Sequence, residues 1–505
     1  MTSLSSIPSP RARVLILGGG PAGSTAASLL ARDGIEVTLI EREVFPRYHI
    51  GESLLPSCLE IADLIGAREL IEKESFQRKP GAYLEWGRES WSLDFGELRG
   101  RHTYSFQVER SRFDHLLLQH ARSQGAEVHE GVEVQSLDFD DTGRPCRAHW
   151  VQRGDDPGAS GVMSGVIVFD YLIDASGRNG IMATRYLRNR KYHQVFQNVA
   201  LWGYWEGAVC DEPGYREGSI AVGSIPDGWL WSIPLGDGRT SIGAVLHKTA
   251  FSRMSRRMNK PSSREEIYHE TIASSPLLTK ICAPATLVSE VMLETDYSYA
   301  AETFCGPGFF LCGDAACFLD PLLSTGVHLA MLSALLGAAS IASLLRGEVS
   351  EPQALSFFEK SYRQAYLRFL VFVSAFYDQG RSKESYFSEA QSLSHYDVER
   401  QGLRQAFLNL VSGIEDMSDA EAVTEHLMGE MSRKVGENLR MRQDKVAMAQ
   451  AGDEQREIQE KNAEFFDHVE GLGALGVAVD GLYVMVQPRL GLSHTQAGVG
   501  QAAAS

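Results

Sequence analysis

The sequence predicts an α/β fold of the Rossmann type, with an inserted antiparallel β-sheet and a helical C-terminal region. Three observations support this prediction: a glycine-rich turn between an apolar strand and a helix, aromatic alternating strands from about residue 195 to 295, and a helical, charged composition beyond residue 350. We expect residues 11–345 to form the core, with the inserted sheet at about 76–106 and 195–295. Residues 346–489 are expected to be helical and residues 490–505 to be disordered.

The glycine-rich turn lies in RVLILGGGPAG, residues 13–23. The apolar run 14–17 predicts a buried parallel strand, and Gly18, Gly20 and Gly23 supply the spacing G-x-G-x-x-G. These glycines permit a tight turn, backbone approach to a pyrophosphate, and close packing of the next helix on the strand. A second strand at 35–40 ends before Glu41, where a ribose-binding carboxylate is expected. The context predicts a dinucleotide site rather than a glycine turn without function.

Composition excludes several classes of protein. The formal net charge of −17 over 505 residues argues against a general nucleic-acid binder. Seven cysteines without paired short spacings indicate a reduced, cytoplasmic protein rather than a disulfide framework or a zinc site, and Cys312 and Cys317 are interpreted as packing residues. The N-terminus has no apolar segment typical of a secretion signal. The uncharged run 321–345 predicts a turn and a buried helix, not a membrane span.

Two segments after the second strand are ambiguous from position alone. Gly51, Glu52 and Ser53 form a polar loop that opens a helix, so backbone N–H groups there could meet a cofactor; an ordinary helix cap is the alternative. Lys79 lies in the strand-like segment RKPGAYLEWG, where a solvated charge is the more frequent outcome.

The next two elements return the chain to the nucleotide-binding sheet. Arg110 falls in the first turn of a helix that ends near Gly125, and since cations usually prefer helix C-termini, we expect an external anionic partner for it. The apolar strand 166–173 ends in DASG, from Asp174 to Gly177.

The inserted sheet contains GWLWSIP, residues 228–234. In a strand, Trp229, Trp231 and Ile233 point to one face and Leu230 and Ser232 to the other, which gives either a flat apolar wall or two core aromatics.

A last apolar strand at 309–312 runs into GDAACFLDPLLSTG. Asp314 ends the strand, Asp320 and Pro321 make a turn, and Thr325 and Gly326 begin the buried helix, so that helix N–H groups point at an anionic or electron-rich group. A second G-x-G-x-x-G match at 471–476 is rejected because no strand precedes it.

In this order, GGGPAG, the GES loop, Arg110, DASG and GDAACFLDP resemble the para-hydroxybenzoate-hydroxylase (GR2) type of FAD-binding fold. Within that fold, WLWSIP, Lys79 in K-x-G-A, and DPLLSTG resemble the flavin-dependent halogenases. The resemblance implies that Lys79 is catalytic, that Thr325 and Gly326 bind halide, and that Trp229 and Trp231 separate flavin from substrate. The cofactor-binding positions that the motifs and the resemblance imply are Gly18, Gly20, Pro21, Ala22, Gly23, Glu41, Arg42, Glu52, Ser53, Arg110, Asp174, Gly177, Asp314, Pro321, Gly326 and Val327.

The resemblance also implies a mechanism. A partner reductase would supply FADH2, O2 would form a flavin hydroperoxide, and chloride or bromide would attack it to give hypohalous acid. Lys79 would hold this oxidant by a hydrogen bond or as a haloamine and pass electrophilic halogen to an aromatic ring. The helical region 346–489 is expected to shape substrate access.

One departure bears on the substrate. Halogenases of free tryptophan carry glutamate where this chain has Leu323, so the resemblance favours a phenolic or pyrrolic ring, often tethered to a carrier protein. Two basic clusters, residues 185–191 and 253–260, could contact an acidic carrier, although solvated faces are the simpler interpretation. The alternatives are an FAD-dependent aromatic monooxygenase, an isoprenoid reductase, which Ile233 disfavours, and a non-catalytic flavin-binding redox module.

Overall fold

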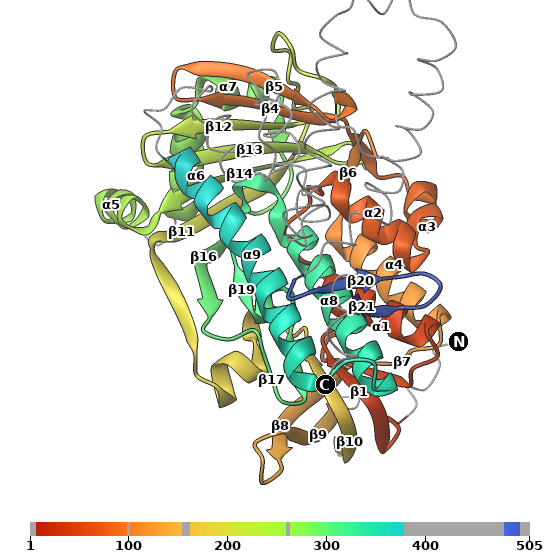
Figure 1. Ribbon diagram of the computed structural model, residues 1–505. Helices are drawn as coiled ribbons and strands as arrows, with labels where there is room; N and C mark the ends of the chain where they lie inside the picture. The colour runs from red at the N-terminus through yellow and green to blue at the C-terminus, as the bar shows by residue number, and fades with distance from the viewer. Residues whose placement is uncertain (1–6, 98–101, 154–161, 259–262, 378–478, 495–505) are drawn as a thin grey trace, which may run out of the picture.

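The computed structural model describes residues 7–97, 102–153, 162–258, 263–377 and 479–494 (Figure 1). Within them the chain forms two large β-sheets with helices between and around them, and the predicted fold class is confirmed. The second glycine motif, at 471–476, lies outside the described residues, as does the end of the basic cluster 253–260.

The first sheet is the Rossmann-like sheet. Its described strands run in the order β17-β18-β10-β1-β2-β7, and β10, β1, β2, β7 and β18 are mutually parallel where they pair. A pair of antiparallel strands, β8 and β9, extends it from β10. The bounds are β1 Arg11–Leu17, β2 Val37–Glu41, β7 Glu127–Glu130, β8 Val132–Phe139, β9 Pro145–Arg153, β10 Val162–Asp174, β17 Cys305–Gly306 and β18 Phe309–Leu311.

The predicted second sheet is also present among the described residues, in the order β19-β16-β11-β14-β13-β12-β4-β5, with β15 beside β11. Its pairs are antiparallel except for β12 and β4, which run parallel. The bounds are β4 Gly81–Trp86, β5 Glu89–Asp94, β11 Arg190–Glu206, β12 Ile220–Ile225, β13 Gly228–Pro234, β14 Arg239–His247, β15 Thr286–Leu287, β16 Met292–Ala301 and β19 Cys317–Phe318.

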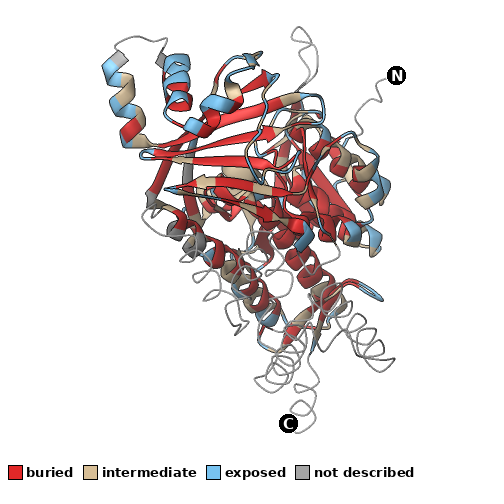
Figure 2. Ribbon diagram, turned by 90° about the horizontal axis from the view of Figure 1, so that it is seen from above, coloured by how far each residue is buried: buried red, intermediate tan, exposed pale blue. Residues whose placement is uncertain are grey.

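The two faces of the second sheet belong to different cores. Trp229, Trp231 and Ile233 pack in the large core shared with the Rossmann-like sheet, whereas Leu230 packs in a smaller core under α6 and α7. The predicted alternation along residues 228–234 is therefore confirmed. Figure 2 shows the buried strands of this sheet, with the exposed helices at its outer edge.

The helices divide by location. Helices α1 Pro21–Arg32, α2 Pro56–Ile65, α4 Arg110–Ser123 and α8 Thr325–Arg346 belong to the Rossmann-like half, where α1 packs on α4 and α8. A short helix, α3 Arg68–Lys73, follows α2 and leads to the strand pair β3 Gln77–Lys79 and β6 Ser105–Gln107. The remaining helices are α5 Lys248–Met258, α6 Ser263–Ala273, α7 Pro276–Cys282 and α9 Glu351–Tyr377.

Helix α8 is the buried helix that the uncharged run predicts. It is long and apolar enough to cross a membrane, but 89% of its most apolar window is buried inside the protein. Helix α9 packs along it (Figure 1). Of the region 346–489, expected to be helical, residues 378–478 lie outside the described residues, and Leu482–Met485 form strand β20 rather than a helix.

The expected disordered tail differs from the structure at its start. Residues 490–494 include strand β21 Gly491–His494, which pairs with β20 Leu482–Met485 and packs on α8. Leu490 and Leu492 are buried, and the backbone N–H of Leu492 donates to Ser343 Oγ at 2.8 Å. The apolar side chains bury against α8, a contact that local composition does not reveal.

Candidate active site

A cavity of about 440 Å³ lies between the two sheets, beyond the carboxyl ends of β1, β2 and β10. This is the place where α/β sheets of this topology bind ligands. Most predicted cofactor-binding residues line it: Gly18, Gly20, Pro21, Ala22, Glu41, Arg42, Glu52, Ser53, Arg110, Gly177, Asp314, Pro321, Gly326 and Val327. Trp229 and Trp231 line its opposite wall.

The glycine turn has the close contacts that its sequence predicts. Gly18 has φ +101°, and a Cβ built on it would lie 2.3 Å from the carbonyl oxygen of Ala175. A Cβ on Gly23 would lie 1.8 Å from the carbonyl oxygen of Gly18. Gly23 does not line the cavity but allows α1 to pack against the turn, which leaves the α1 N-terminus at Gly20 open to an anionic group.

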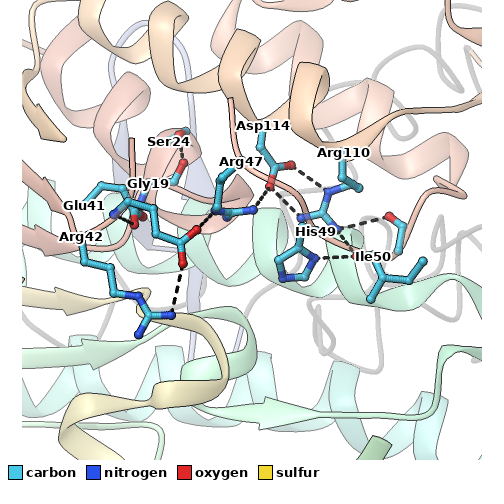
Figure 3. A network of polar contacts seen from close by, with 11 residues as sticks. Gly19, Ser24, Glu41, Arg42, Arg47, His49, Ile50, Arg110 and Asp114 are labelled. Carbon is cyan, nitrogen blue, oxygen red and sulfur yellow. Dashed lines mark hydrogen bonds and ion pairs between the residues drawn. The ribbon is translucent and has the colours of Figure 1, made fainter. Parts of the chain in front are cut away.

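Glu41 is the last residue of β2 and faces the glycine turn (Figure 3). Its Oε2 accepts a hydrogen bond from the backbone N–H of Gly19 at 2.7 Å, and its Oε1 accepts one from the N–H of Glu43 at 2.8 Å. These bonds hold the carboxylate at the cavity wall, at the position where a ribose hydroxyl is expected.

Arg110 has an internal partner instead of the expected external one. Its Nε and Nη2 donate to the two carboxylate oxygens of Asp114 at 2.8 and 2.9 Å, and Nη1 donates to the carbonyls of Ile50 and Gly51 (Figure 3). The adjacent Arg110 guanidinium keeps the pKa of Asp114 below its usual value despite burial. Arg110 therefore fixes the GES loop at the cavity edge.

Sequence reasoning missed several residues of the cavity wall. Arg47 lines it, lies 3.2 Å from Asp114 Oδ2, and stacks over Phe45 at 4.6 Å. Its sequence signal was only a basic residue shortly before the GES loop. The other missed polar residues that line the cavity include Tyr48, His49, Ser176, Arg178, Asn179, Arg185 and Ser324.

The paired tryptophans form a wall of the cavity. Their ring centroids are 5.8 Å apart, with planes inclined by 49°. The indole N–H of Trp229 donates to Tyr377 Oη at 3.0 Å, and that of Trp231 donates to Ser241 Oγ at 3.3 Å. Both indole N–H groups therefore have a hydrogen-bond acceptor, and the ring faces remain apolar.

The loop before α8 is held by a buried carboxylate. Asp320 Oδ1 accepts from the N–H of Leu322 at 3.0 Å, and Oδ2 accepts from Asn198 at 2.9 Å and from Tyr377 Oη at 2.5 Å. Burial raises the pKa of Asp320 to about 6. Ser324 then adopts φ +59°, and α8 begins at Thr325.

Of the two residues predicted to bind halide, one lines the cavity and the other does not. Gly326 lines the cavity, and apart from its chain neighbours and the backbone of its own helix no described atom lies within 4 Å of a Cβ built on it. Thr325 is buried and is not part of the lining.

Lys79 is buried beside the cavity rather than in its wall. It is 2% exposed, and its Nζ donates to the carbonyl of Leu54 at 3.0 Å and lies 5.4 Å from the centre of the Phe95 ring. Burial lowers the pKa of Lys79 to about 7. Leu54 directly follows Ser53, which lines the cavity. The GES loop therefore lies between the cavity and the Lys79 amine.

Asp174 is also outside the lining. Its Oδ1 accepts from the N–H of Ser176 at 3.1 Å and its Oδ2 from the N–H of Met182 at 2.7 Å. It therefore shapes the turn that places Ser176 and Gly177 in the wall.

The sequence and the fold were compared with known proteins. A family model described as tryptophan halogenase matches residues 13–103 and 98–418. The chain is 44% identical to a tryptophan 2-halogenase of Chondromyces crocatus, over 95% of this chain and 93% of that one. It is 40% identical to the flavin-dependent halogenase armH1 of Armillaria mellea, over 82% and 79% of the two chains. The solved structure of the myxobacterial chondrochloren halogenase CndH is 35% identical, with TM-score 0.66 over 80% of this chain and 90% of that one.

Proposed function

The chain belongs to the flavin-dependent halogenase family, and from this premise we propose that it transfers a halogen to an electron-rich aromatic ring through Lys79. The family uses FADH2, O2 and a halide. The observation that supports the role of Lys79 most strongly is a buried amine, beside the cavity, that no carboxylate neutralises among the described residues.

The cavity has the features that FAD requires. The α1 N-terminus and the arginines of the lining, Arg42 and Arg47 among them, suit a diphosphate, and Glu41 suits a ribose hydroxyl. Two buried oxygen atoms of the wall, Glu52 Oε2 and Ser53 Oγ, have no hydrogen-bond partner within the described residues. When bound, FAD supplies the two-electron chemistry with O2. The residues named above would bind and orient it.

Unpaired buried oxygen atoms also belong to the strand pair that carries Lys79 and to the loop beside it. Ser105 lies directly opposite Lys79 in the β3–β6 pair, and Gln107, two residues on, forms a bridge with Ser53. Ser53 Oγ, Ser105 Oγ and Gln107 Oε1 are buried and make no hydrogen bond within the described part of the chain. Unsatisfied buried polar atoms are rare in folded proteins. Their grouping supports a position for a small polar oxidant between the cavity and Lys79.

The remaining parts of the proposal follow from the cavity wall. Gly326, with open space before it, and the backbone of Thr325 would bind the halide at the α8 N-terminus. Trp229 and Trp231 would keep the organic substrate away from the flavin, since both indoles lie in the wall opposite the glycine turn. A separate reductase would supply FADH2.

For the substrate, we propose a phenolic or pyrrolic ring, presented free or on a carrier protein. Leu323 is buried in the apolar core, so this position provides no carboxylate to assist halogenation of a less activated ring. The relative from Chondromyces crocatus is named a tryptophan 2-halogenase, which makes an indole a second candidate.

The basic clusters differ in their availability to a carrier. Arg185 lines the cavity and Lys191 pairs with Glu302, so the cluster 185–191 is engaged within the protein. On α5, Arg253 and Arg257 pair with Asp227 and Glu270. These ion pairs favour solvated faces over a carrier site.

All seven cysteines are free, which supports a cytoplasmic location.

The test is a mass-spectrometric assay of purified protein with FAD, an NADH-dependent flavin reductase, O2 and bromide. The panel holds monochlorodimedone, free and carrier-loaded phenols and pyrroles, and tryptophan. We expect a mass gain with the bromine isotope pattern on a phenol or pyrrole, and its loss in Lys79→Met. Bromination of tryptophan alone would replace the substrate proposal by the indole. Full activity of Lys79→Met would refute the lysine relay.

A further inference from the structure

Halide oxidation in this family has a proton requirement that the proposed residues do not meet. FADH2, O2, a halide ion and one proton give FAD, hypohalous acid and water. O2 gains two electrons from FADH2 and two from the halide, its O–O bond breaks, and one oxygen leaves as water. At the inner wall of the cavity, where Glu52 is 3% exposed, a buried side chain is positioned to supply the additional proton.

A hydrogen-bonded chain of side chains ends at the cavity wall. Tyr204 Oη on β11 donates to Glu52 Oε1 at 2.8 Å, and the hydroxyls of Tyr48 and Tyr204 are 3.1 Å apart. The indole N–H of Trp202 donates to Tyr48 Oη at 2.7 Å. Because the Tyr204 proton points to Glu52 and Trp202 occupies an acceptor site of Tyr48, Tyr48 is the donor to Tyr204.

We propose that Glu52 is the proton donor for halide oxidation and that Tyr204 and Tyr48 return a proton to it from solvent. Glu52 lines the cavity and is 3% exposed; its Oε2 atom makes no hydrogen bond within the described residues, although the Ser241 hydroxyl also lies near the carboxyl. Tyr48 is 54% exposed, which gives the outer end of the chain access to water. This inference rests on the family reaction and not on Lys79 or on the aromatic substrate.

The acid–base properties of the chain fit this role. Burial raises the pKa of Glu52 to about 7, so the carboxyl gains and loses a proton near neutral pH. Burial raises the pKa of Tyr204 far above its usual value, so Tyr204 remains protonated and accepts one proton as it gives up another.

Glu52 is surrounded by groups of both signs. Arg110 and the hydroxyls of Tyr204 and Ser241 favour its charged form, whereas burial and Glu109 favour the neutral form. Arg239 lies over the Tyr204 ring at 4.8 Å. Other ionisable residues of the wall are less suited. Burial lowers the pKa of His49 to about 4, and the Asp314 carboxylate accepts no hydrogen bond from an exposed hydroxyl among the described residues.

The first experiment uses the protein without flavin. Infrared difference spectra across pH should contain a protonated carboxyl that titrates near pH 7, the value expected for Glu52. The band should be lost in Glu52→Gln. In Tyr204→Phe it should change frequency and titrate at higher pH, because the hydroxyl favours the carboxylate. A band titrating near pH 7 that is as intense in Glu52→Gln as in the wild type, or that Tyr204→Phe leaves unchanged, would overturn the proposal. The Asp320 carboxyl, whose pKa is about 6, should remain in both variants.

The second experiment uses the protein with FAD, a reductase, O2 and bromide, and measures how FADH2 consumption divides between bromide oxidation and release of hydrogen peroxide. Without halide oxidation, FADH2 and O2 give FAD and hydrogen peroxide. We expect Glu52→Gln to lower bromide oxidation on the order of a hundredfold, with peroxide replacing it. Tyr204→Phe and Tyr48→Phe should lower it by less, about tenfold, because Glu52 remains and only its resupply with protons is slowed; this is below the roughly hundredfold effect of losing the proton donor itself.

The matched control is Tyr215→Phe. Tyr215 packs in the smaller core on the far face of the second sheet and donates to the carbonyl of Ser219 at 2.9 Å, outside the cavity lining. It should leave the division of FADH2 unchanged. Unaltered bromide oxidation in folded Glu52→Gln would overturn the role of Glu52. If Glu52→Gln does not fold, the titration of Tyr204→Phe decides between the two outcomes.

Discussion

Replacement of Lys79 by methionine should change the stability of the protein in opposite directions at neutral and alkaline pH. Lys79 is fully buried, and burial lowers its pKa from 10.5 to about 7. In the unfolded chain the amine binds a proton up to about pH 10.5, so between these two pKa values the folded state holds fewer protons than the unfolded state. The burial of Lys79 therefore destabilises the wild type most at low pH, and stability rises as the pH approaches 10.5.

The magnitude follows from the two pKa values. At pH 7 the cost is about 4 kcal/mol, and at pH 10 it is about 1 kcal/mol. Methionine removes this cost and fills a similar volume, but it leaves the Leu54 carbonyl without the Lys79 donor, a loss of about 2 kcal/mol. Lys79→Met should therefore be about 2 kcal/mol more stable than the wild type at pH 7 and about 1 kcal/mol less stable at pH 10.

Urea unfolding followed by tryptophan fluorescence at both pH values measures this difference. The control is Lys73→Met, because the Lys73 side chain is 72% exposed and makes only a surface ion pair, with 3.6 Å between its Nζ and Glu69 Oε2. Its effect should stay within about 0.5 kcal/mol at either pH. If Lys79→Met is destabilised equally at both pH values, the amine is not desolvated in the folded protein, and the argument for a reactive buried lysine fails.

Three further predictions concern the cavity and its support. Gly23→Ala should lower FAD affinity and the melting temperature, because its Cβ would lie 1.8 Å from the Gly18 carbonyl oxygen. Flavin titration measures the affinity and calorimetry the melting temperature. The control is Gly337→Ala, whose Cβ would lie 3.5 Å from Cys312 Sγ and which should leave FAD affinity unchanged. Trp231→Ala should increase uncoupled hydrogen peroxide or oxygen insertion into the substrate, and unchanged coupling would make Trp231 a core residue only. Leu492→Ala should reduce the free energy of unfolding by about 2–3 kcal/mol, since the side chain is 4% exposed, whereas a null effect would indicate that residues 490–494 do not pack on α8.

Much of the Rossmann-like half could be predicted because its signals are local. Gly18, Gly20 and Gly23 allow backbone approaches that a Cβ would block, so their spacing records the geometry of the turn directly. The alternation of Trp229, Trp231 and Ile233 assigns the inner face of a strand without any knowledge of its partners. Both features are fixed by residues within one turn or one strand.

The partners of charged and polar side chains could not be predicted in this way. Arg110 looked available to an external anion, yet Asp114, one helical turn later, takes its guanidinium in two hydrogen bonds. The strand at residues 491–494 was missed because its stability comes from burial against α8, about 150 residues earlier in the chain. Such contacts depend on which segments the fold brings together.

By itself the sequence predicted the glycine turn and the inner face of the strand at residues 228–234, since each depends on the chemistry of a short segment, whereas Lys79 was singled out by the resemblance of several motifs to a family. Only the tertiary structure decided that Lys79 is dry and lies behind the GES loop, and that Glu52, Tyr204 and Tyr48 form one hydrogen-bonded chain. Desolvation and hydrogen bonding set proton affinity, and both depend on residues more than a hundred positions apart.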